Sequence, residues 1–321
     1  MTNPTVFPIA LGCMSMAGGL YGPSDEAENI ATIHAALDRG VNLLDTGDFY
    51  GQGRNELLVG RALAGRRRDE AILSVKFGGM RDPAGNFIGF DTRPLAVKNA
   101  LSYSLVRLGV DYIDIYRPAR LDPSVPIEDT IGAIADMVKA GYVRHIGLSE
   151  VGPETIRRAA AVHPIHDLQI EYSLLSRGPE ATIFPVLEQL GIAVTAYGVL
   201  SRGLLTNTQP TAPSDYRAHL PRFAPENRAR NQRLIDALAR LAAAKHVTPA
   251  QLAIAYVRAK KPYIIPTLGA RTRAQLDDAL GALAVSLTPA DVAALEDAVP
   301  ASAVAGTRYA APMMAHLDSE R

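Results

Sequence analysis

Short segments rich in β-branched residues alternate with longer amphipathic segments along most of the chain, and this alternation constrains the fold more than any other feature. Eight segments have the length and composition of strands: 7–11, 41–45, 71–76, 112–116, 143–148, 167–171, 193–197 and 263–266. Helical patterns lie between them at 28–39, 94–108, 127–140, 153–160, 182–190, 227–244 and 273–280. Strands that alternate with helices indicate parallel βαβ units, and eight such units close into a (β/α)8 TIM barrel.

Helix start signals agree with this prediction. Thr248, Thr272 and Thr288 each stand three residues before a side chain that can complete a capping box. The main alternative is a doubly wound open sheet, which would carry a G-x-G-x-x-G turn after its first strand. No such turn follows the first strand, and the stretch at 51–53 lacks the third glycine. The sequence therefore predicts one barrel domain over 1–321, with a long loop at about 202–226 and a C-terminal tail at about 301–321.

Composition and charge exclude several classes of protein. The chain has 33 basic and 33 acidic side chains, so it has no electrostatic drive toward nucleic acid. Cys13 is the one cysteine, which excludes a disulfide framework and gives no reason to expect a metal. The N-terminal segment lacks the basic region of a signal peptide, and no apolar run is long enough to span a membrane. We expect a cytoplasmic protein that acts on a small molecule, and the oligomeric state is left open.

Polar residues stand where the predicted strands end. In a TIM barrel the active site lies at the C-terminal ends of the strands, on the loops that follow them. The residues at these ends are Asp45, Tyr50, Lys76, Ser149, Glu150, Gln169, Tyr197 and Gly198, and the last strand leads through Gly269 to Arg271 and Arg273. Packing alone does not explain so many polar groups on one face, so we expect the active site there.

Three of these residues can form a proton donor. A phenol ionises near pH 10, so an isolated Tyr50 is a poor acid at neutral pH. A neighbouring Lys76 would lower the pKa of that phenol, and Asp45 would keep the ammonium charged. Such a donor suits a carbonyl oxygen that becomes an alkoxide as hydride reaches its carbon. The alternative is an ion pair between Asp45 and Lys76 that only stabilises the barrel, with Tyr50 packed in a loop.

Several motifs, in order along the chain, resemble those of the aldo-keto reductase superfamily. They are Asp45-Thr-Gly-Asp-Phe-Tyr50-Gly-Gln-Gly-Arg-Asn-Glu56, Ser-Val-Lys76, Gly147-Leu-Ser-Glu150, Gln169-Ile-Glu-Tyr172-Ser and Ala196-Tyr197-Gly-Val-Leu-Ser-Arg202-Gly. The similarity extends from about residue 7 to about residue 300. It implies a (β/α)8 barrel that reduces carbonyl compounds with a nicotinamide cofactor, usually NADPH, bound without a Rossmann fold.

The resemblance also implies a role for each matching residue. Tyr50 would be the general acid, tuned by Asp45 and Lys76. Ser149 and Gln169 would hold the nicotinamide carboxamide, Tyr197 would stack on the ring, and the backbone of Leu200, Ser201 and Arg202 would follow the pyrophosphate. Glu150, Gly198 and Gly269 complete the expected cofactor contacts.

One position departs from the family pattern. Relatives carry a catalytic histidine at the end of the fourth strand, and Ala119 stands at that position. Three interpretations remain open: a working enzyme in which Ala119 leaves room for a water or a bulkier substrate, a weak reductase with a narrow task, or a regulatory protein that binds cofactor without useful turnover. Strand alternation could direct Arg117 into the barrel as a substitute donor, although an outward Arg117 is the simpler expectation. We place Ala119, Arg117 and Tyr21 in the substrate pocket.

Arginines after the last strand bear on cofactor preference. Arg271 and Arg273 stand at a predicted helix N-terminus, which suits the 2′-phosphate of NADPH. The family pattern has arginine where Gln275 stands and asparagine at Ala279, and Gln275 is also the expected capping partner of Thr272. We therefore expect NADPH, with NADH less favoured, and a small carbonyl substrate.

Overall fold

Eight parallel strands close into a barrel in the computed structural model, which describes residues 5–18, 21–210, 212–213 and 215–321. The strands are β1 (Ala10–Gly12), β2 (Leu43–Gly47), β3 (Ile72–Phe77), β6 (Ile113–Pro118), β7 (Val143–Ser149), β8 (Ile165–Glu171), β9 (Ala193–Tyr197) and β10 (Ile264–Gly269). Each pairs with its neighbours in sequence order, and β1 closes the ring between β2 and β10. The predicted (β/α)8 TIM barrel is confirmed.

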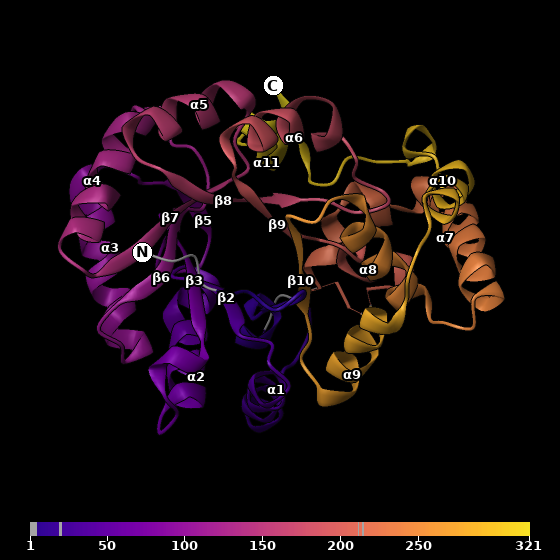
Figure 1. Ribbon diagram of the computed structural model, residues 1–321, viewed down its shortest axis with the longest axis horizontal. Coiled ribbons are helices and arrows are strands. Elements are labelled where there is room, and N and C mark those ends of the chain that lie inside the picture. Colours follow the sequence, from indigo (N-terminus) through magenta and orange to yellow (C-terminus); the bar gives the residue numbers. More distant parts are fainter. Residues whose placement is uncertain (1–4, 19–20, 211, 214) are drawn as a thin grey trace.

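Helices surround the barrel, as Figure 1 shows. They are α1 (Glu26–Asp38), α2 (Arg54–Leu63), α3 (Pro94–Leu108), α4 (Ile127–Lys139), α5 (Pro153–Val162), α6 (Pro179–Leu190), α7 (Pro225–Ala244), α8 (Pro249–Lys260), α9 (Arg273–Gly281), α10 (Pro289–Ala298) and the short α11 (Ala311–Met314). Their apolar faces join the outward side chains of the strands in one core. None of the helices in the described part of the chain is both long and apolar enough to cross a membrane.

The interior of the barrel changes from apolar to polar along its axis. A small cluster of Ala10, Leu43, Ile72 and Ile115 fills the bottom. Because side chains alternate across a strand, the residues two and four positions further along also point inward. On β2 and β3 these next positions are Asp45, Ser74 and Lys76, all buried. The fold thus places polar groups at the C-terminal ends of the strands, above an apolar plug.

Several details of the helix caps and strands differ from the prediction. Thr248 and Thr288 form complete capping boxes, but Gln275 accepts from Arg271 N at 2.8 Å instead of from Thr272 N, so the third box is only half formed. The first strand begins at Ala10 rather than at residue 7, because Pro8 has no N–H to donate. β6 extends through Pro118, which costs little at the end of a strand. A hairpin of β4 (Gly79–Arg81) and β5 (Phe87–Phe90) was not predicted.

Candidate active site

Asp45 lies at the centre of the polar groups in the barrel mouth. Lys76 Nζ donates to one carboxylate oxygen at 2.5 Å, and Ser74 Oγ and Gln169 Nε2 each donate to the other at 2.8 Å. Both Asp45 and Lys76 are about 5% exposed, so the pair is shielded from water. The predicted ion pair is present, and it fixes the Lys76 ammonium at the end of β3.

Tyr50 lies above this pair in the loop after β2. The Lys76 ammonium is 5.2 Å from the centre of the Tyr50 ring, and Phe49 packs edge-on against the ring at 4.8 Å. Burial and the Asp45 carboxylate raise the pKa of the phenol well above its usual value, whereas the Arg120 guanidinium lowers it. The sequence-based expectation of a lowered pKa is therefore wrong, because burial and the Asp45 carboxylate outweigh the Arg120 cation. The phenol stays protonated at neutral pH.

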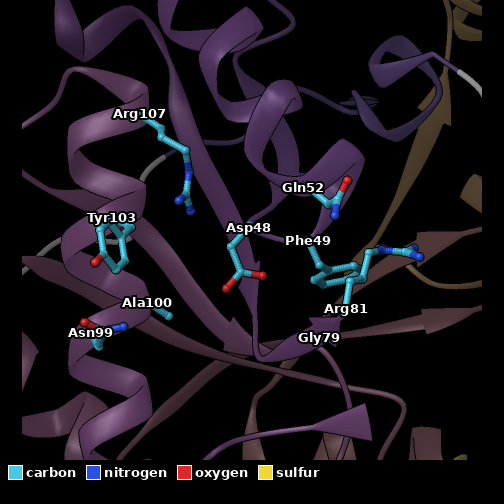
Figure 2. Close-up of a pocket in the computed structure, with 9 residues that line it drawn as sticks. All are labelled: Asp48, Phe49, Gln52, Gly79, Arg81, Asn99, Ala100, Tyr103 and Arg107. Atoms are coloured by element: carbon cyan, nitrogen blue, oxygen red, sulfur yellow. The ribbon is translucent and has the colours of Figure 1, made fainter. Parts of the chain in front are cut away.

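Asp48 stands in the same loop, two residues before Tyr50. Figure 2 shows its side chain pointing into a cavity between the Tyr50 loop and α3, and this cavity has a volume of about 360 Å³. Asp48 Oδ2 accepts from Gly78 N at 3.3 Å, whereas the buried Oδ1 has no partner among the described residues. Burial, followed by the Glu56 carboxylate, raises the pKa of Asp48 to about 7. Keeping this carboxylate ionised costs stability.

We expect the Asp48→Asn variant to be more stable than the native protein at pH 8 by about 1–2 kcal/mol. The folded pKa lies above the unfolded value, so the native state loses stability as the pH rises from about 4 to about 7, and asparagine does not ionise. Urea unfolding at pH 5 and pH 8 measures the difference. The advantage of the variant should grow between the two; an advantage that is constant or shrinks would contradict this assignment.

Arg117 points into the barrel rather than outward. It is fully buried, with Nη1 at 3.0 Å from Asp167 Oδ2 and Nη2 donating to Ser74 Oγ at 3.0 Å. Gly147 makes room for it, because a Cβ at that position would lie 3.1 Å from the guanidinium carbon. The Arg117 cation is thus held below Asp45, away from the mouth.

Ala119 and Arg120 follow β6 directly. The Ala119 side chain is buried and carries no polar atom, and its N–H donates to Phe77 O at 2.9 Å. Arg120 Nη1 donates to Ala119 O at 2.6 Å and to Ser149 Oγ at 3.4 Å. Arg120 was not among the residues predicted from the sequence, yet its guanidinium lies at the mouth beside a predicted cofactor contact.

The C-terminal tail lies across the other side of the mouth, and Figure 1 shows the chain end beside α5. Arg308 donates both Nη atoms to the fully buried Glu150, at 2.8 and 2.6 Å. The Arg308 guanidinium and Ser319 hold the pKa of Glu150 at about 2 although burial alone would raise it. The Tyr197 hydroxyl donates to Glu150 at 2.7 Å and is 2.8 Å from the Tyr309 hydroxyl. Glu150 therefore anchors the tail. The Tyr309 hydroxyl contacts Tyr197, the residue on whose ring a nicotinamide is expected to stack.

The loop after β9 has an unusual backbone. Ser201 and Arg202 have φ of 46° and 57°, which non-glycine residues adopt rarely and mostly at functional sites. Gly198 has φ of 67°, and a Cβ there would lie 3.0 Å from the Glu171 side chain. Arg202 Nη2 donates to Glu171 at 2.9 Å, and Leu200 caps the short helix that follows. The contact of this turn with a pyrophosphate stays a prediction.

The arginines after β10 already have partners. Arg273 pairs with Glu28, with its own N–H and Nη2 both at 2.9 Å from that carboxylate. Arg271 Nη1 donates to the carbonyls of Tyr21 and Pro23 at 3.0 Å. A cofactor 2′-phosphate would have to displace Glu28 from the N-terminus of α9.

Two orphaned hydroxyls indicate that a polar ligand fits here. Ser15 Oγ and Thr267 Oγ1 are buried and have no hydrogen-bond partner among the described residues. Both border the ends of β1 and β10, where Ser15 Oγ lies 3.5 Å from the position of a Cβ on Gly269. Because buried hydroxyls are normally paired, these groups suit a bound polar molecule such as a dinucleotide.

Tyr21 also reaches the mouth, in the loop between β1 and α1. Arg217 lies 5.6 Å from the centre of its ring. Burial raises the pKa of Tyr21, and the Arg202 cation lowers it. Part of the neighbouring loop, residues 19 and 20, lies outside the described residues. Tyr21 therefore lies close to the Arg202 and Arg217 cations, and its place in a substrate pocket stays a prediction.

The chain matches the family model described as Aldo/keto reductase family over residues 8–300. It is 39% identical to "Probable aldo-keto reductase 1" of Glycine max, over 95% of this chain and 88% of that protein. It is 37% identical to "Aldo-keto reductase yakc [NADP(+)]" of Schizosaccharomyces pombe, over 96% of this chain and 92% of that protein. Among solved structures, it resembles the glycerol dehydrogenase AKR11B4 of Gluconobacter oxydans, with a TM-score of 0.84, 30% identity and 92% of each chain covered.

Proposed function

Since this chain belongs to the Aldo/keto reductase family, we propose that it reduces an aldehyde or ketone to the alcohol with NADPH, with Tyr50 as the proton donor. When bound, NADPH would supply the hydride for the carbonyl carbon. The observation that carries the proposal is the arrangement at the mouth: a protonated phenol next to a buried Lys76–Asp45 pair. Carbonyl reduction needs a proton for the alkoxide, and Tyr50 can give it.

Lys76 and Asp45 act on Tyr50 by position. The buried Lys76 ammonium faces the Tyr50 ring. Its positive charge therefore stabilises the phenolate that forms as Tyr50 gives up its proton. Asp45 keeps that ammonium in place, together with Ser74 and Gln169. Ser149, Tyr197 and the turn at Leu200, Ser201 and Arg202 are the proposed contacts of the cofactor.

NADPH is the proposed cofactor because two cations stand at the N-terminus of α9. One relative carries NADP(+) in its name. The contact between Glu28 and Arg273 opposes this preference, since a carboxylate repels a 2′-phosphate. A small carbonyl compound as substrate and a cytoplasmic location belong to the same proposal.

The test is cofactor oxidation with a panel of reactive aldehydes and ketones. We expect turnover with NADPH, and slower turnover with NADH at the same concentration. If both cofactors bind, as followed by the change in emission of the reduced nicotinamide, but no carbonyl compound is reduced, the chain is a cofactor-binding regulatory protein and the proposal is wrong. Faster turnover with NADH would overturn only the cofactor preference.

A further inference from the structure

We propose that the Arg120 guanidinium is a catalytic hydrogen-bond donor, which contacts the carbonyl oxygen of the substrate beside Tyr50 and replaces the side chain that Ala119 lacks. The inference rests on the proposed reductase function. It concerns how this chain stabilises the developing alkoxide without a histidine at the end of β6.

Arg120 is placed to reach that oxygen. It is the second residue after β6, and Nη1 bonds to Ala119 O and Ser149 Oγ, which directs the side chain across the mouth toward β7. Nε is buried without a partner in the described part of the chain. A buried N–H group without an acceptor lowers the stability of the folded protein. The unpaired Nε of Arg120 therefore points to a ligand that accepts a hydrogen bond from it.

Arg120 also differs from three other cations around the barrel mouth. Each of these three forms an ion pair with a carboxylate: Lys76 with Asp45, Arg202 with Glu171, and Arg308 with Glu150. Within the described ranges, Arg120 has no carboxylate oxygen at 4.0 Å or less. The Glu150 carboxylate acts on the Arg120 cation only from a longer distance, so the guanidinium N–H groups are not taken up by a paired carboxylate.

The positive charge of Arg120 acts on the Tyr50 phenol. Of the cations around the phenol, Arg120 is the one that most lowers its pKa against the effects of burial and Asp45. Its contact with Ser149, a proposed partner of the nicotinamide carboxamide, places the guanidinium beside the proposed site of hydride transfer. Guanidinium stays charged at all working pH values and presents several N–H groups in one plane, so it can donate to the oxygen while Tyr50 gives the proton.

The experiment compares Arg120→Met and Arg120→Lys in the full-length enzyme, with the exposed Arg158→Met as the matched control. We expect Arg120→Met to lower kcat for the neutral 4-nitrobenzaldehyde by about 100-fold, as for the loss of one oxyanion donor. The Kd for NADPH and the thermal unfolding midpoint should stay near native values, and Arg120→Lys should retain part of the rate. Adding Ala119→His to Arg120→Met should restore part of the lost kcat.

The pH profile separates this role from simple packing. Without the cation the pKa of Tyr50 rises, so the alkaline limb of the kcat profile for reduction should move to higher pH in Arg120→Met. An unchanged kcat, or a loss confined to the KM of the anionic 4-carboxybenzaldehyde, would overturn the inference and make Arg120 a substrate anchor. A loss confined to NADPH affinity would make it a cofactor contact. An inactive native protein would instead refute the proposed function.

Discussion

Replacing Tyr50 by phenylalanine should lower kcat for aldehyde reduction by about 1000-fold while leaving the fold intact. The Tyr50 hydroxyl forms no hydrogen bond to any described residue, so its removal leaves no buried group unpaired. Phenylalanine keeps the ring that packs on Phe49 and faces Lys76. The change therefore removes the proton donor and little else.

Steady-state kinetics with NADPH and a reactive aldehyde measure this effect, and fluorescence titration checks that the variant still binds NADPH. Retained binding with lost turnover assigns the proton transfer to Tyr50. Native-like turnover in Tyr50→Phe would remove Tyr50 from the mechanism and leave a bound water as the proton source. Loss of binding and turnover together would indicate that the ring, not the hydroxyl, shapes the cofactor site.

The arrangement of the barrel could be predicted because it depends on local periodicity. Strand alternation alone places Asp45, Lys76 and Gln169 on the inner face, near the ends of their strands. The structure brings these three together within hydrogen-bond distance, although Gln169 follows Asp45 by 124 positions. Inward-facing side chains in a closed barrel all point toward its axis. The positions of these residues along their strands were therefore sufficient to predict that their side chains meet.

The contacts of the tail could not be predicted in this way. Arg308 and Tyr309 lie in a segment without a helical or strand period, and their partners Glu150 and Tyr197 are more than 100 positions away. The sequence predicted only a C-terminal tail at about 301–321, and this tail lies across the mouth. No local sequence pattern predicts which distant carboxylate Arg308 will pair with.

The pKa of Tyr50 and the place of Arg120 depend on depth and loop geometry. The sequence indicated a cation near Tyr50, but how far the phenol is removed from water is a property of the assembled mouth. Arg120 follows a strand, where alternation no longer fixes the direction of a side chain. Its position is set by its bonds to Ala119 O and Ser149 Oγ, which only the structure shows.

Lys76→Met should lower the free energy of unfolding by about 3–5 kcal/mol, because it leaves the Asp45 carboxylate buried without its cation. Ser74 and Gln169 would still donate to the carboxylate, so the protein should fold. Urea unfolding followed by circular dichroism measures the change.

The double variant Lys76→Met and Asp45→Asn is the matched control. It removes both charges and keeps side chains of similar volume, so it should recover most of the lost stability, since a buried ion pair contributes little net stability once neither charge remains. It should not recover activity, because the ammonium that faces Tyr50 is still absent. Recovery of turnover in the double variant would show that the pair only holds the barrel together. A single Lys76→Met variant as stable as the native protein would show that water reaches Asp45 despite its burial.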